Sequence, residues 1–203
     1  MSSRNGKRRE IKPLKVSCTD FDCESELHCF KKSRRMTEAE RGNCRSCGIS
    51  VVNWTRVHSR SINDAAYTFE ALNSEFVRNH FWNKPIDLKA ENHARRKGRS
   101  KLREAIRARL KKSVGTASPS FDGRQTPDHG NIIYYAQHAL ACCCRTCMEY
   151  WHGIPKGVEL SDEQIDYFTE LIMKYVDARM PELTEEGENI PRIRHSRDEE
   201  SQD

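Results

Sequence analysis

Apolar side chains recur at three- and four-residue spacing along much of the chain, a pattern that predicts a mainly helical fold. The first such stripe lies between residues 63 and 81, where Asn63 or Asp64 can cap a helix that runs to about Phe81. Pro85 then breaks the chain. The stripe consists of Phe69, Leu72, Phe76 and Val77.

A second helix is predicted from Asp87 to about Lys112, weakened at Gly98. Gly, Pro, Ser and Asp dominate residues 113–131, so this segment is expected to be a loop. The thin apolar stripe of the second helix consists of Ala90, Ala94, Leu102, Ala105, Ile106 and Leu110.

Two shorter helical patterns complete the carboxy-terminal half. Asn131 can cap a helix that begins at Ile132, and Ser161 with Gln164 forms a capping box for the last helix, which ends before Pro181. The buried stripe of that last helix is predicted to be Ile165, Phe168, Ile172, Tyr175 and Val176.

Residues 15–60 follow a different pattern. The segment 49–58 is rich in β-branched residues and alternates in polarity, which predicts a strand, and 27–31 is a second candidate. Thr37 with Glu40 reads as a capping box for one helical turn between them. This part of the chain is expected to form a small zinc-ribbon or treble-clef module.

The predicted fold is therefore mainly α, within the α+β class, and has four parts. Residues 1–14 form a flexible basic arm, residues 15–60 the cysteine-rich zinc module, residues 61–181 a helical domain with a Cys/His cluster, and residues 182–203 a disordered acidic tail. The acidic tail is expected to shield the basic middle of the chain from unwanted partners.

Composition limits the size of the hydrophobic core and the cellular location that we expect. Only 36% of residues are apolar and 32% are charged, so we expect a small hydrophobic core that needs additional cross-links, such as bound metal ions. The chain has no apolar run long enough to span a membrane, and its basic start lacks the apolar centre of a signal peptide. We therefore expect a cytoplasmic protein with no membrane partner, in which clustered cysteines are metal ligands or redox groups rather than disulfides.

The first cysteine group lies in the amino-terminal module. Cys44-Arg45-Ser46-Cys47-Gly48 has the spacing of a zinc knuckle, because two thiolates two residues apart can reach one tetrahedral ion. Cys18 and Cys23 are the preferred partner pair, with Cys29 in reserve, and Cys23 with Cys29 or His28 remains an alternative. This group predicts a structural zinc ion.

The second group is the densest in the chain, with four of the nine cysteines and two of the eight histidines in residues 134–153. An unbroken helix would place these side chains on opposite faces, so either the helix breaks near the cysteines or they do not all bind one ion. The predicted ligands are His138, Cys144, Cys147 and His152, with Cys143 nearby. Zinc is the favoured metal, and an iron–sulfur cluster is less favoured because evenly spaced thiols are few.

Other chemistry for this cluster stays open. Cys144 and Cys147 have the spacing of a redox dithiol, and Cys142 with His138 at four-residue spacing is an alternative catalytic pair.

The predicted second helix is strongly basic, with eleven Lys or Arg against two Glu between Lys89 and Lys112. Like charges repel along a helix surface, so a polyanionic partner that neutralises them is favoured. We therefore predict nucleic-acid contact through Arg95, Arg96, Lys97, Arg99, Lys101 and Arg103.

Three strings carry a family resemblance: DGRQTP at 122–127, AQHALACCCRTC at 136–147, and WHGIPKG from Trp151. In these strings, over roughly residues 74–180, the chain resembles a bacterial family of domains of unknown function, DUF4186. The resemblance implies site residues at His138, Cys143, Cys144, Cys147 and His152. Cys142 departs from the family pattern, which has threonine there, and the amino-terminal cysteine module resembles an addition found in only some members.

The resemblance implies no activity, so function is argued from the residues. The favoured hypothesis is a zinc-binding protein, with one or two zinc sites, that contacts nucleic acid. The rival is a metal- or thiol-dependent enzyme, a hydrolase or nuclease, that uses the carboxy-terminal cluster; it needs an open coordination position and a general base. A third hypothesis is a scaffold that binds a protein partner through the basic helix.

Overall fold

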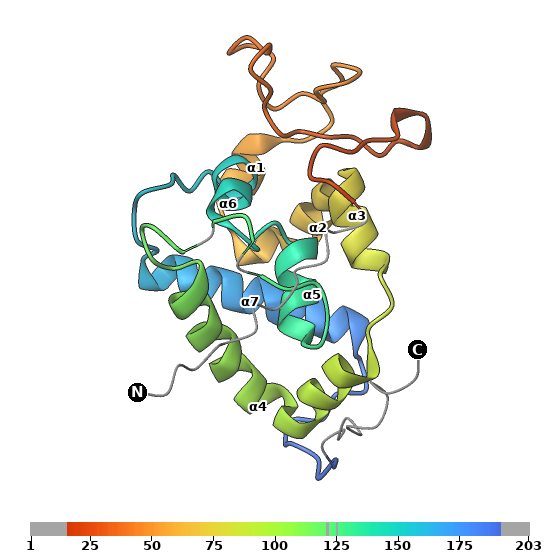
Figure 1. Cartoon of the computed structure of the whole chain (residues 1–203), viewed down its shortest axis with the longest axis vertical. Coiled ribbons are helices and arrows are strands. Elements are labelled where there is room, and N and C mark those ends of the chain that lie inside the picture. Colours follow the sequence, from red (N-terminus) through yellow and green to blue (C-terminus); the bar gives the residue numbers. More distant parts are fainter. Residues whose placement is uncertain (1–15, 121, 125, 192–203) are drawn as a thin grey trace, which may run out of the picture.

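The computed structural model describes residues 16–120, 122–124 and 126–191 (Figure 1). These residues form helices and turns, and their only β pairings are isolated bridges of Asp22 with Leu27 and of His28 with Glu75. The mainly α prediction is confirmed. The elements are η1 (Cys23–Ser25), α1 (Trp54–His58), η2 (Ile62–Asp64), α2 (Ala65–Asn73), α3 (Phe76–Asn83), α4 (Leu88–Ser113), α5 (Ile132–Ala139), α6 (Arg145–His152) and α7 (Asp162–Arg179).

The strand predicted over residues 49–58 is wrong. Its second half is the helix α1, because the side chain of Asn53 caps the amide of Arg56 and starts a helical turn. The predicted strand at 27–31 is reduced to the two isolated bridges. The amino-terminal module is therefore built from turns rather than from paired strands.

The helix predicted up to Phe81 is divided into α2 and α3. The break occurs at Glu75, whose backbone is extended with φ −95° and ψ 126°. The amide of His28 donates to Ser74 O at 2.8 Å, and the amide of Phe76 donates to His28 O at 2.9 Å. The amino-terminal module is thus hydrogen-bonded into the gap between these two helices.

The long helix α4 packs against α7 (Figure 1). A row of ion pairs joins the two helices. The apolar residues Leu102, Ile106 and Leu110 of α4 are fully buried, as their spacing predicts. The predicted weak point at Gly98 is a real kink, with φ 64° and ψ 178°. The ion pairs are Arg99–Asp177, Arg103–Glu170, Arg107–Asp166, Arg107–Asp162 and Lys111–Asp162.

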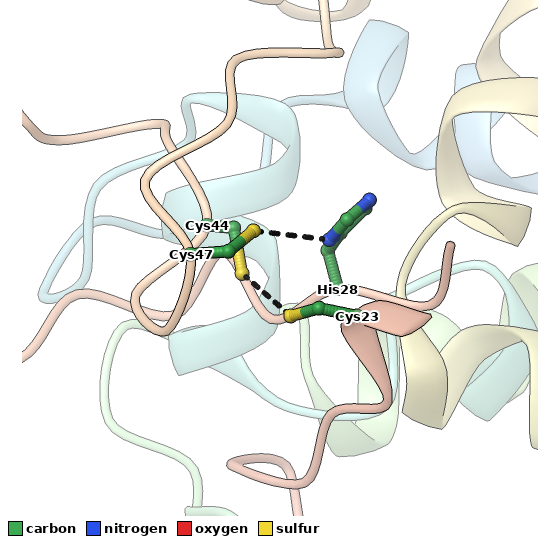
Figure 2. A group of neighbouring side chains, drawn as sticks. All are labelled: Cys23, His28, Cys44 and Cys47. Atoms are coloured by element: carbon green, nitrogen blue, oxygen red, sulfur yellow. Dashed lines mark hydrogen bonds between the residues drawn. The ribbon is translucent and has the colours of Figure 1, made fainter. Parts of the chain in front are cut away.

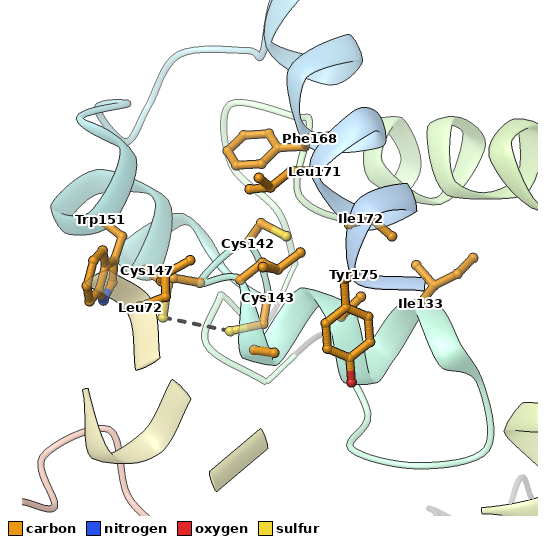
Figure 3. Close-up of a cluster of buried hydrophobic side chains, with 14 of the residues drawn as sticks. Leu72, Ile133, Cys142, Cys143, Cys147, Trp151, Phe168, Leu171, Ile172 and Tyr175 are labelled. Atoms are coloured by element: carbon orange, nitrogen blue, oxygen red, sulfur yellow. Dashed lines mark hydrogen bonds between the residues drawn. The ribbon is translucent and has the colours of Figure 1, made fainter. Parts of the chain in front are cut away.

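The core gathers where α5, α6 and α7 meet, around Trp151, Phe168 and Tyr175 (Figure 3). The capping box predicted for α7 is present, since the Gln164 amide donates to Ser161 Oγ and the Gln164 side chain accepts from the Ser161 amide.

The loops of the amino-terminal module that precede α1 lie at one end of the molecule (Figure 1). Phe30 anchors the module, because its ring meets the rings of Trp54 and Trp151 edge to face at centroid distances of 5.8 Å. The predicted flexible arm, residues 1–14, lies outside the described residues.

The acidic tail differs from the predicted disorder over the part that the structure describes, residues 182–191. Its backbone follows the kink of α4, where the amide of Arg99 donates to Thr184 O and the amide of Glu188 donates to Arg95 O. Glu188 also forms an ion pair with Arg95 at 2.7 Å. Among the described residues, no helix combines the length and apolar character that crossing a membrane requires.

Candidate metal centres

Four side chains of the amino-terminal module converge on one point: Cys23, His28, Cys44 and Cys47 (Figure 2). Their ligand atoms all lie within 4.8 Å of one another. The Cys23 and Cys44 sulfurs are 3.7 Å apart, and the Cys47 sulfur is 3.6 Å from His28 Nδ1. Ligands of a tetrahedral zinc ion, at about 2.3 Å for sulfur and about 2.0 Å for nitrogen, are separated by roughly 3.5 to 3.8 Å. The group therefore has the dimensions of a tetrahedral metal site.

The local backbone explains this arrangement. The Gly48 amide donates to Cys44 O at 2.9 Å and the Ser46 amide lies 3.5 Å from Cys44 Sγ, which is the turn expected of a knuckle. Gly48 has φ 76°, a conformation that glycine adopts without strain. Cys23 begins the turn η1, and His28 is fixed by its bridge to Glu75.

The structure brings together three of the preferred ligands and the alternative His28. Cys29 is buried with its thiol donating to the carbonyl of Cys18 at 3.4 Å, and burial raises its pKa to about 11. Cys18 lies outside this group, and its sulfur lies 3.9 Å from Nη2 of Arg78.

The second group consists of Cys143, Cys144 and Cys147, whose sulfurs all lie within 4.8 Å of one another. The Cys147 sulfur is 3.7 Å from that of Cys143 and 3.4 Å from that of Cys144. The predicted break in the helix is real: α5 ends at Ala139, and Cys144 caps α6 by accepting from the Cys147 amide. Both cysteine groups are positioned to hold a metal ion.

The histidines predicted to complete the second group lie elsewhere. His138 Nε2 donates to Thr126 O at 3.1 Å and its ring stacks on Phe81, while His152 Nε2 donates to Leu140 O at 2.8 Å. Burial lowers the pKa of each imidazole to about 4, so both rings are neutral near pH 7. The predicted set of His138, Cys144, Cys147 and His152 is therefore replaced by three cysteines.

Cys142 is also separate from the second group. Its side chain lies on the side of Leu171 and Phe168, away from the contact between Cys143 and Cys147 (Figure 3). It is fully buried, and burial raises its pKa well above the ordinary value, so it is a protonated core residue.

A buried arginine, which the sequence did not single out, borders the second group. Arg78 is 0% exposed and forms an ion pair with the equally buried Glu75 at 3.0 Å. Its Nη2 lies 3.3 Å from Cys147 Sγ and 3.9 Å from Cys18 Sγ, and its Nη1 lies 3.9 Å from Cys143 Sγ. A guanidinium in this position stabilises thiolates, because its N–H groups point toward them.

The basic helix α4 is less available to a partner than its composition indicates. Three of the six residues predicted to bind nucleic acid, Arg95, Arg99 and Arg103, form ion pairs with acidic residues of α7 or the tail. No ion pair of Arg96, Lys97 or Lys101 is present among the residues that the structure describes. The repulsion along α4 is thus relieved within the molecule itself.

Comparison with known proteins identifies a family but no activity. The family model described as Domain of unknown function (DUF4186) matches residues 66–177, which confirms the resemblance seen in the sequence. No solved structure matches the chain. The first metal group lies outside the matched residues, and the second lies within them.

Proposed function

Because the chain belongs to the DUF4186 family, whose description states no activity, we propose its function from the site itself: it is a zinc-binding protein whose amino-terminal ion folds a small docking module. The observation that carries this proposal is the convergence of Cys23, His28, Cys44 and Cys47. Three thiolates and one imidazole suit zinc, and distances of 3.7 and 3.6 Å suit its tetrahedral geometry.

A structural role is supported better than a catalytic one. Four protein ligands fill a tetrahedral zinc ion and leave no position for water or substrate. The module also has little else to hold it, because its described secondary structure before α1 is one short 3₁₀ turn and isolated bridges. In such a module the free energy of metal binding is largely free energy of folding.

Nucleic acid is the partner class that we propose for this module. Five basic side chains surround its loops, and none of them forms an ion pair with another described residue. Three of them, Arg34, Arg35 and Arg45, line a hollow in the surface together with Ser33, Met36 and the single acidic residue Glu40. Phosphate groups are the chemistry that unpaired cations in such a hollow favour. The five are Lys31, Lys32, Arg34, Arg35 and Arg45.

The metal proposal is tested by elemental analysis of the purified full chain. Wild type is expected to contain zinc, and Cys47→Ser is expected to lose the amino-terminal ion while keeping its helical circular dichroism. Cys142→Ala is the matched control, because that cysteine lies in neither group. Zinc that is equally abundant in Cys47→Ser and wild type would contradict the proposal.

The nucleic-acid proposal is tested by binding to single- and double-stranded DNA and RNA across a series of salt concentrations. Replacing Lys31, Lys32, Arg34 and Arg35 by glutamine is expected to weaken binding and to make its salt dependence shallower, by about 0.7 to 0.9 in log–log slope for each lost contact. Arg103→Gln with Arg107→Gln is the control, because α7 already neutralises both. Unchanged affinity after the loop substitutions would exclude this surface.

A further inference from the structure

We propose that Cys18 is the fourth ligand of a second tetrahedral zinc site, formed with Cys143, Cys144 and Cys147. The ion would tie the amino-terminal segment directly to the helical domain of the family. This inference goes beyond the proposed function, because it concerns a separate ion and does not require nucleic-acid binding.

The three domain cysteines supply most of a closed site. They are buried, and the sulfur separations of 3.7 and 3.4 Å along two edges are close to those of ligands around one ion. Structural zinc sites in proteins almost always have four protein ligands, so three buried thiolates leave one position to fill.

Cys18 is the side chain best placed to fill that position. Its sulfur lies 3.9 Å from Nη2 of Arg78, and the same Nη2 lies 3.3 Å from the Cys147 sulfur, so the two sulfurs border one guanidinium group. The other candidates are engaged: His138 and His152 each donate to a backbone carbonyl, and the side chain of Cys142 lies on the side of Leu171 and Phe168 (Figure 3).

The backbone around Cys18 is fixed by local hydrogen bonds. The Ser17 amide donates to the Asp20 carboxylate at 2.7 Å and the Asp20 amide donates to Ser17 O at 3.1 Å, which closes a turn around Cys18. The thiol of Cys29 donates to the carbonyl of Cys18 at 3.4 Å. Cys29 therefore has a role without being a ligand, since it supports the backbone that carries one.

The charge of the surroundings also fits a thiolate-rich site. Four thiolates around a divalent ion carry a net negative charge, which is costly to bury without nearby donors. Arg78 is fully buried within 3.3 to 3.9 Å of three of the four sulfurs. Donors of this kind orient the ligands of a metal site and tune its affinity.

The site would join parts of the chain that the family comparison separates. Cys18 precedes the matched residues 66–177, whereas the other three cysteines lie inside them. The second ion would then add to the attachments of the amino-terminal segment that the structure already has, the bridge of His28 to Glu75 and the packing of Phe30 on Trp151.

The test compares two full-length single variants with wild type by elemental analysis and X-ray absorption at the zinc edge. Wild type is expected to hold two zinc ions. Cys18→Ser is expected to lose the second ion or to release it to a chelator at least about tenfold faster than wild type. Cys47→Ser, which removes a ligand of the first site only, isolates the second site, and its remaining ion is expected to show four sulfur ligands.

A double variant keeps the proposal testable if Cys18→Ser alone fails to fold. Adding Cys18→Ser to Cys47→Ser should reduce the sulfur number around any retained ion from four to three, a change that general unfolding does not produce. Cys142→Ala is the matched control and should keep all four sulfurs, because Cys142 lies in neither group. Unchanged zinc content, chelator kinetics and sulfur number in Cys18→Ser would overturn the proposal, as would iron in place of zinc or a single ion in wild type that Cys47→Ser abolishes. The last result would leave the first site intact.

Discussion

Arg78 and Glu75 form an ion pair that is completely buried at the junction of the module and the domain. Glu75 also accepts hydrogen bonds from Trp151 Nε1 at 2.7 Å and from the hydroxyl of Tyr150 at 3.0 Å. Breaking a buried pair leaves a charge with neither water nor partner. We therefore expect Arg78→Met to lower the free energy of unfolding by about 3–5 kcal/mol.

Urea denaturation of the metal-loaded protein measures this loss. The exposed pair of Arg103 with Glu170 provides the control, and Arg103→Gln should change stability by less than about 1 kcal/mol. Adding Glu75→Gln to Arg78→Met should recover part of the loss, because the stranded charge is then removed. A loss below about 1 kcal/mol for Arg78→Met would mean that the pair does not hold the junction.

His138 and His152 make stability depend on pH. Burial lowers both pKa values to about 4 in the folded protein, whereas an unfolded histidine has a pKa of about 6.5. The unfolded state therefore binds more protons between these values, so the stabilisation is complete above about pH 6.5 and is lost as the pH falls toward 4. Each ring contributes up to about 3 kcal/mol across this window.

The pH dependence is checked by urea denaturation from pH 7 to pH 4.5. His152→Gln should make the fall in stability shallower by up to about 1.4 kcal/mol per pH unit, because one proton fewer is taken up on unfolding. A zinc-sensitive dye in the same samples separates proton uptake by histidine from metal release. An unchanged slope would show that His152 is protonated equally in both states.

At the scale of the element, the sequence predicts those features that depend on residues close together in the chain. The knuckle of Cys44 and Cys47 and the capping box of Ser161 and Gln164 depend on neighbours two or three residues away. The division between α2 and α3 was not visible, because the apolar stripe continues across Ser74 and Glu75 and the break is made by a distant segment at His28.

The basic helix shows what one element alone cannot predict. Its charge indicated an external polyanion, but the acids that neutralise it lie on α7, at four-residue spacing in Asp162, Asp166 and Glu170. The pairing of α4 with α7 could have been predicted from the sequence, because one helix carries a basic stripe and the other an acidic one. The sequence indicates His28 only as an alternative member of the first group, and the burial of Arg78 has no local signal in the sequence.

The kink of α4 and the acidic tail depend on each other. A Cβ atom at Gly98 would lie 2.4 Å from the backbone carbon of Glu186, so Gly98→Ala is expected to displace residues 184–188 from the helix. Hydrogen exchange should then accelerate at the amides of Arg99 and Glu188, which are bonded across this contact. Gly157→Ala is the control, since Gly157 has φ 79° but no atom near its Cβ position. Unaltered exchange at both amides would contradict the contact.

Displacing the tail also tests whether it shields α4. Arg95 loses its partner Glu188 in the Gly98→Ala protein, so affinity for a polyanion such as heparin should rise if the tail competes for this helix. Equal affinity in both proteins would assign the tail a purely structural role.

For the whole molecule, the amino-terminal module is expected to depend on bound metal for its stability more than the helical domain does. Most of the buried apolar cluster belongs to the helical domain, around Trp151 and Phe168, and the amino-terminal module joins it chiefly through Phe30. His28→Ala removes one of the four side chains proposed to hold the first ion, so it should unfold the module and leave the helices intact. Limited proteolysis should produce new cuts between residues 31 and 48, with little change in helical circular dichroism. A variant that stays resistant to protease would show that packing alone holds the module, and one that loses its helical signal would show that the domain needs the module in order to fold.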